Sequence, residues 1–184
     1  MVNKGFETWG YDINVSCVNK AKHCGILATV DWTRIPHSDV SAYIICVSTS
    51  GVDLLFKLDM SAAWKVCRKI ASSNDDDDLL VSIESTVAIG TCRKIYNSTF
   101  KRSVNLVHVP HRYWSQDPIK HGVRQLRVIG GIDEDSLRMG LRLYQQLKIP
   151  LHSVSSIETA EMSKIVENSY RFLQIAFAEE LNDV

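Results

Sequence analysis

A polar stripe on the last predicted helix is the strongest candidate for chemistry in this chain. At about 100° per residue, four polar side chains fall on one face of that helix: Glu161, Lys164, Asn168 and Arg171. Lys164 and Asn168 stand at positions i and i+4, so their ammonium and amide groups can reach one point. A cation beside an amide on a rigid element can stabilise a developing oxyanion. A solvated helix face is the alternative interpretation of this pattern.

The composition argues against several classes of protein. Of the 184 residues, 21 are Lys or Arg and 21 are Asp or Glu, so the charge lacks the positive excess of a nucleic-acid-binding domain. No apolar run approaches the length of a membrane span, and the first residues contain no apolar signal core. Five cysteines without a C-x-x-C pair favour reduced thiols, which indicates a cytoplasmic protein.

Apolar runs alternate with helix-period segments along the chain. Buried strands are predicted at 42–47, 79–83, 104–109 and 126–129. Helices are predicted at 60–71 after Asp59 and at 134–147 after Asp133, and a capping box at Ser155–Glu158 opens the last helix. This alternation predicts an α/β, Rossmann-like doubly wound domain with a parallel sheet, followed by a long helix.

The N-terminal part shows one acid at the end of a predicted strand. In a dinucleotide-binding domain the second strand ends in an acid that binds ribose hydroxyls, about 20 residues beyond a glycine-rich turn. Asp12, after Gly10 and Tyr11, fits that place, but only eleven residues precede it. The first strand and its G-x-G-x-x-G turn are therefore expected to be absent. A plain turn residue is the alternative for Asp12.

Six segments, in order, resemble the NAD-dependent nucleotide-sugar dehydrogenases (the UDP-glucose/GDP-mannose dehydrogenase family). Ile83–Thr91 is similar to the family's E-S-T-V-x-x-G-T turn, and Glu158–Glu180 resembles its central helix with the K-x-x-x-N pattern. These two motifs are fairly specific. Weaker likenesses lie at 10–12, 44–50, 109–112 and 127–131.

The resemblance implies a reaction and a cofactor. The C6 primary alcohol of a UDP-sugar becomes a carboxylate while two NAD are reduced, and a cysteine thiolate holds the substrate between the steps. Such a reaction belongs to polysaccharide biosynthesis. Lys164 and Asn168 would stabilise the oxyanion. The resemblance also implies NAD contacts by Asp12, Thr49, Ser85 and Thr86, a water contact by Thr86, and nucleotide-sugar contacts by Glu161, Arg112 and Arg171.

One departure from the family pattern concerns the hydrolytic step. The family has a glutamate where this chain has His111. A histidine can serve as a general base near neutral pH, and a purely local hydrogen bond is an equal alternative. Arg112 keeps the family's P-x-R form, which slightly favours the branch of the family that acts on UDP-N-acetylamino sugars. His108 and His111 lie three residues apart, a spacing that alone predicts no metal site.

The other departure is the nucleophile. The family's cysteine lies in a G-x-C-x-x-K-D segment that this chain lacks. Cys92 follows Gly90-Thr91 at a helix start, where either a lowered pKa or a structural role fits. We therefore expect a truncated, inactive chain. Residues 1–154 would form a partial NAD-binding domain and 155–184 the start of a helical dimerisation domain that builds a homodimer. The alternatives are an assembly module pairing with itself or a full-length relative, and one piece of a split enzyme.

Overall fold

The computed structural model describes residues 1–49, 59–74, 76–101, 104–111 and 125–182. The chain divides into two compact units, residues 1–40 and 41–184. Within the described residues, no helix is long and apolar enough to cross a membrane.

The N-terminal unit is a small β-α-β arrangement. Strands β1 (Trp9–Tyr11) and β2 (Leu27–Thr29) pair in parallel, with Gly10 opposite Ala28, and helix α1 (Val15–His23) connects them. Asn14 caps α1 by accepting a hydrogen bond from the Ser16 amide. Three short 3-10 helices complete the unit: η1 (Val2–Lys4), η2 (Trp32–Arg34) and η3 (His37–Asp39). The structure thus confirms a strand that ends directly before Asp12.

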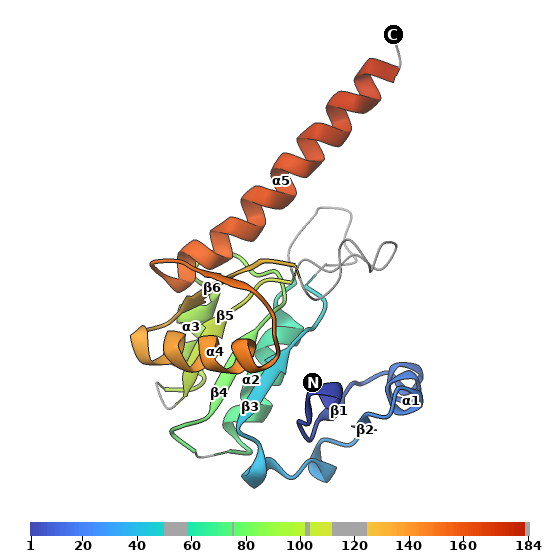
Figure 1. The fold of residues 1–184 in the computed structure, drawn as a ribbon, viewed down its shortest axis with the longest axis vertical. Coiled ribbons are helices and arrows are strands. Elements are labelled where there is room, and N and C mark those ends of the chain that lie inside the picture. Colours follow the sequence, from blue (N-terminus) through green and yellow to red (C-terminus); the bar gives the residue numbers. More distant parts are fainter. Residues whose placement is uncertain (50–58, 75, 102–103, 112–124, 183–184) are drawn as a thin grey trace. The chain divides into compact units, whose positions relative to one another are not determined.

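The second unit is built on a five-stranded sheet in the order β3-β4-β5-β6-β7 (Figure 1). The strands are β3 (Ala42–Ile45), β4 (Leu80–Ile83), β5 (Asn105–His108), β6 (Arg127–Gly131) and β7 (Leu151–Ser153). The four predicted strands are present within about two residues, the usual uncertainty of such boundaries. Their fully buried residues, such as those of β4, explain why they appear as continuous apolar runs.

Two strands, β6 and β7, run against the prediction of a parallel sheet. β6 pairs antiparallel with β5, with Val107 opposite Gly131, while the other neighbouring pairs of this sheet are parallel. A run of buried apolar residues is the same in either direction, so the sequence pattern carried no information on this orientation. The sheet is therefore parallel-dominated rather than fully parallel.

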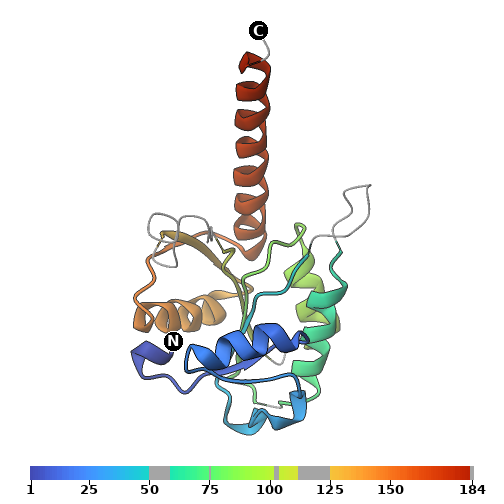
Figure 2. The same ribbon diagram turned by 90° about the vertical axis from the view of Figure 1, so that its right-hand side faces the viewer.

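Helices cover both faces of this sheet. Figure 2 shows α4 (Glu134–Gln146) on one side and α2 (Ser61–Ala71) and α3 (Thr91–Ser98) on the other. Asp133 caps α4 through the Ser136 amide at 2.8 Å, as predicted. Asp59 accepts from the Ser61 amide at 2.9 Å, so it supports the start of α2, one residue later than predicted.

The last helix, α5 (Ile157–Asn182), begins against the sheet and then leaves it (Figure 1). Its cap differs from the predicted Ser155–Glu158 box. The hydroxyl of Ser156 accepts from the Thr159 amide at 3.1 Å, and Glu158 pairs with Arg93 instead. An ionic partner on α3 competes for the Glu158 carboxylate, which the sequence pattern could not show. Residues 169–182 of α5 are exposed.

Candidate functional site

The carboxyl ends of β3 and β4 meet at one edge of the sheet. The Thr49 hydroxyl donates to the Thr86 carbonyl oxygen at 2.7 Å. The Ser85 hydroxyl donates to the Val47 carbonyl at 2.7 Å and accepts from the Val47 amide at 2.8 Å. The structure therefore brings the predicted cofactor residues Thr49, Ser85 and Thr86 together, at the edge where ligands bind in such sheets.

These three hydroxyl groups differ in what they offer a ligand. Thr49 and Ser85 are buried, and their hydroxyls already bond to the main chain. Thr86 is half-buried. We infer that Thr49 and Ser85 fix the shape of the edge, while Thr86 presents its side chain at the surface. Their contacts with NAD stay predictions.

His111 lies at the same edge, beyond the end of β5. Its main-chain amide donates to the Glu84 carbonyl oxygen at 3.1 Å. Burial lowers the pKa of His111, and the positive charges of Arg127 and Lys164 lower it further against the opposing effect of Glu84. A neutral imidazole near neutral pH can accept a proton, which general-base catalysis requires. Arg112, the next residue, lies outside the described residues.

Lys164 lines a cavity of about 270 Å³ between the end of β5, β6 and α5, and the lining residues are Pro110, Val128, Ser163, Lys164 and Glu167. The Lys164 side chain is only 14% exposed, and its Nζ lies 3.5 Å from Glu167 Oε2. A solvated helix face therefore does not describe this lysine. Asn168, one turn further, is half-buried and does not line the cavity. Arg171 is exposed.

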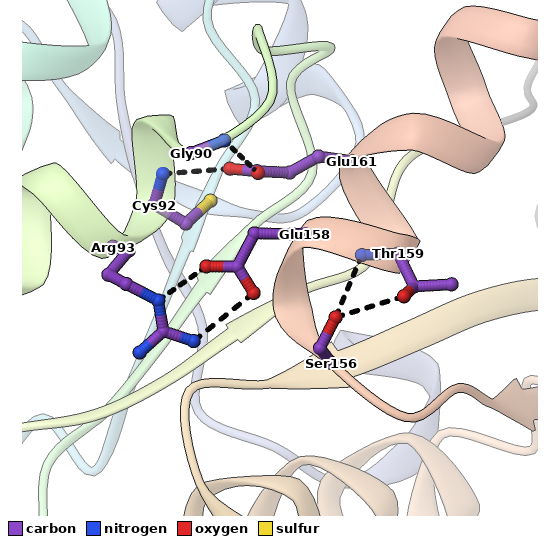
Figure 3. A network of polar contacts seen from close by, with 7 residues as sticks. All are labelled: Gly90, Cys92, Arg93, Ser156, Glu158, Thr159 and Glu161. Carbon is purple, nitrogen blue, oxygen red and sulfur yellow. Dashed lines mark hydrogen bonds and ion pairs between the residues drawn. The ribbon is translucent and has the colours of Figure 1, made fainter.

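Glu161 takes a different position from the predicted one. It is fully buried, and its carboxylate accepts from the Gly90 amide at 2.6 Å and the Cys92 amide at 2.8 Å (Figure 3). Unpaired amides and the helix dipole at the start of α3 stabilise a carboxylate there. Both oxygens are thus engaged by the main chain, a geometry that does not match the predicted substrate contact.

The same contact decides between the two interpretations of Cys92. This thiol is fully buried, and burial together with the neighbouring Glu161 carboxylate raises its pKa well above the usual value. The helix start that could have lowered the pKa is neutralised by Glu161. Cys92 is therefore a structural residue.

A buried polar cluster beneath this edge was not predicted from the sequence. Arg127 Nη1 donates to Glu84 Oε2 at 3.0 Å, and the Tyr144 hydroxyl donates to Glu84 Oε1 at 2.5 Å. The Ser82 hydroxyl lies 2.7 Å from that of Tyr144. The sequence did contain a signal for this cluster. Glu84 and Arg127 border apolar strands, where a buried charge without a partner would destabilise the fold.

Asp12 belongs to the N-terminal unit. It follows β1, is half-buried, and its Oδ1 accepts from the Asn14 amide at 2.8 Å. This hydrogen bond is that of a turn residue, the alternative given above. An acid at the carboxyl end of a parallel strand also fits the ribose hydroxyls of a dinucleotide. The two roles are compatible, because one oxygen suffices for the turn.

Residues 10–148 match the model of the UDP-glucose/GDP-mannose dehydrogenase family, NAD binding domain. The chain is 31% identical to UDP-N-acetyl-D-mannosamine dehydrogenase of Methanococcus maripaludis over 98% of its own length and 46% of the relative's, and 30% identical to that of Methanocaldococcus jannaschii over 96% and 45%. It thus spans about half the length of these curated relatives.

Solved structures of dehydrogenases have a similar fold. The UDP-D-ManNAc dehydrogenase structure from Pyrococcus horikoshii has a TM-score of 0.82 and 25% identity over 97% of this chain and 48% of that one. The GDP-mannose dehydrogenase structure from Pseudomonas aeruginosa has a TM-score of 0.81 at 20% identity, over 97% of this chain and 47% of that one, and shows the shared fold alone. The chain belongs to the UDP-glucose/GDP-mannose dehydrogenase family, and residues 10–148 match its NAD-binding domain.

Proposed function

We propose that this chain supplies the NAD-binding half, and the oxyanion-stabilising lysine, of a nucleotide-sugar dehydrogenase that oxidises C6 of a UDP-N-acetylamino sugar. The observation that carries the proposal is the position of Lys164, which is shielded from solvent, lines a cavity together with Pro110 and lies close enough to His111 to lower the pKa of that residue. The relatives at about 30% identity are UDP-N-acetyl-D-mannosamine dehydrogenases, which supports the substrate class.

Each unit offers one residue for a contact with NAD. In the N-terminal unit, Asp12 at the end of β1 would bind ribose hydroxyls. In the second unit, Thr86 at the edge of β3 and β4 would contact the reacting end. Bound NAD accepts hydride. The protein's contribution is to hold the reacting ends together and exclude water from them.

The overall reaction converts a C6 alcohol, one water and two NAD⁺ into a carboxylate, two NADH and three protons. Each stage develops negative charge on the C6 oxygen, and the Lys164 ammonium would stabilise it, with Asn168 assisting. His111, with its lowered pKa, would accept the proton of the hydrolytic water.

Three thiols of the second unit, those of Cys46, Cys67 and Cys92, have raised pKa values and so do not offer the thiolate that the family reaction needs. The Cys46 side chain is exposed, but partial desolvation and the Glu84 carboxylate raise its pKa to about 12. Burial raises that of Cys67 to about 12 and that of Cys92 further. A protonated thiol is a poor nucleophile. We therefore propose that the nucleophile comes from a separate segment and that this chain alone does not complete the oxidation.

Complementation tests this division of labour. NADH formation from UDP-N-acetylmannosamine would be followed by absorbance, first with this chain alone and then with the segment of the Methanococcus maripaludis relative that the chain does not match. The expected result is no NADH from either piece and turnover from the mixture, lost when this chain carries Lys164→Ala. NADH production by this chain alone would contradict the inactive part of the proposal.

Helix α5 supports a second role, self-association. Its outer part exposes large apolar side chains, with Phe172 72% and Phe177 67% exposed. Exposed apolar stripes of this kind mark interfaces. We propose a homodimer through α5, or pairing with a full-length relative. Light scattering should give twice the chain mass, reverting to the chain mass in Phe172→Asp/Phe177→Asp. A monodisperse monomer of the unmodified chain would contradict it.

A further inference from the structure

Glu161 connects two segments that carry separate parts of the proposed site. It lies on α5, one turn before Lys164. Its carboxylate bonds to the amides of Gly90 and Cys92, at the end of the 86–90 turn that begins with Thr86 (Figure 3). A single buried carboxylate therefore joins the Thr86 turn to the Lys164 helix.

The first turn of α5 has its own anchor on the sheet. A Cβ at Gly130 of β6 would lie 2.5 Å from the Ser156 carbonyl oxygen and 2.9 Å from Ile157 Cα. Only glycine allows this approach, so the backbone of α5 begins in direct contact with β6. Ala160 packs at the same place and is fully buried.

Because α5 starts on β6, the Glu161 contact acts on a helix that is already placed. It does not have to hold α5 on the sheet. What it fixes is the distance between the start of α3, with its preceding turn, and the next turn of α5. An outer ion pair between Arg93 and Glu158 joins the same two helices, but it is solvent-exposed, and exposed pairs contribute little.

We propose that Glu161 is a positioning residue: its carboxylate clamps the 86–90 turn to α5 and so sets the separation of Thr86 and Lys164. The inference rests on the proposed function, because it concerns the geometry of that same site. A side chain at this place needs two acceptor oxygens, since two main-chain amides face it, the Gly90 amide partly buried and the Cys92 amide buried. Glutamine would turn one NH₂ donor toward an amide, and aspartate is one methylene too short to reach both.

The experiment compares Glu161→Gln and Glu161→Asp with the control Glu158→Gln, which removes the outer ion pair from the same turn of α5. Three quantities would be measured at a temperature where circular dichroism shows every variant folded. They are hydrogen exchange of the Gly90 and Cys92 amides, the ¹³C resonance of reductively methylated Lys164, and kcat and KM in the complemented mixture. The first two require no turnover.

The expected result for Glu161→Gln is amide exchange faster by about tenfold or more, as loss of a buried charged hydrogen bond implies. The Lys164 resonance moves, and kcat falls by up to about a hundredfold while the KM for NAD stays within about twofold. Glu161→Asp gives intermediate changes, and Glu158→Gln gives none. If Glu161→Gln does not fold, Glu161→Asp is judged by the same criteria.

An unmoved Lys164 resonance despite faster exchange would overturn the proposal, because Glu161 would then merely cap α3. Unchanged exchange would overturn it too. Absence of NADH from the unmodified mixture would instead contradict the proposed function. The exchange and resonance measurements would still test whether Glu161 clamps the 86–90 turn to α5.

Discussion

His108 is expected to make the protein sensitive to mild acid. This residue ends β5 and is fully buried, and among the described residues neither ring nitrogen has a hydrogen-bond partner. Burial lowers its pKa from the ordinary 6.5 to about 4. On acidification the unfolded chain therefore takes up a proton at about pH 6.5, whereas the folded chain does so only near pH 4.

The sign and magnitude follow from this difference. The depressed pKa in the fold means that stability is present above pH 6.5 and is lost as the pH falls toward 4. At about 1.4 kcal/mol per pKa unit, the full effect is on the order of 3 kcal/mol, of which about 2 kcal/mol is lost between about pH 7.5 and about pH 5. The lowered pKa of His111 adds to this loss in the same direction.

Urea denaturation at the two pH values measures the effect. His108→Leu removes the titrating group, so its free energy of unfolding should change with pH by about 2 kcal/mol less than that of the unmodified chain. His152→Leu, at an exposed site in the same sheet, should keep the original pH dependence. An identical pH dependence in His108→Leu and the unmodified chain would refute the reasoning.

Three further predictions concern the packing and the site. Gly130→Ala should lower the stability by about 1–3 kcal/mol in thermal denaturation, because α5 must shift to make room for the new Cβ. The control Gly10→Ala should lower it less, since its Cβ would meet its nearest neighbour at 3.5 Å. Equal losses of stability would contradict the close approach at Gly130. Arg127→Met should cost about 3–5 kcal/mol by urea denaturation, because it leaves the Glu84 carboxylate buried without its partner, and adding Glu84→Gln should recover part of the loss; a cost within error would show that the pair is not buried. Lys164→Ala should change the free energy of unfolding by less than about 1 kcal/mol, and a larger loss would identify this lysine as structural.

Four strands of the second unit and helix α4 could be predicted because these strands are short apolar runs, with β4 fully buried, and because α4 has a capping acid. The short elements α1, β2 and β7 were not predicted. It could not predict the direction of β6, since apolar content carries no direction. The family resemblance assigned Thr49, Ser85 and Thr86 to one site, and the structure brings these residues together because the carboxyl ends of parallel strands meet at one edge.

The sequence did not predict the neighbours of the polar side chains on α5. Glu161 and Lys164 share a helix face, but the first reaches the buried start of α3 and the second a cavity. The helix period predicts which residues share a face of the helix, but not which neighbouring element each of them contacts.

The most direct test of the central claim is calorimetric titration of the purified chain with NAD, with and without UDP-N-acetylmannosamine. Saturable binding in the micromolar-to-millimolar range is predicted, weakened in Asp12→Ala and retained in the control Asp31→Ala of the same unit. A folded sample that releases no heat with NAD would contradict the account.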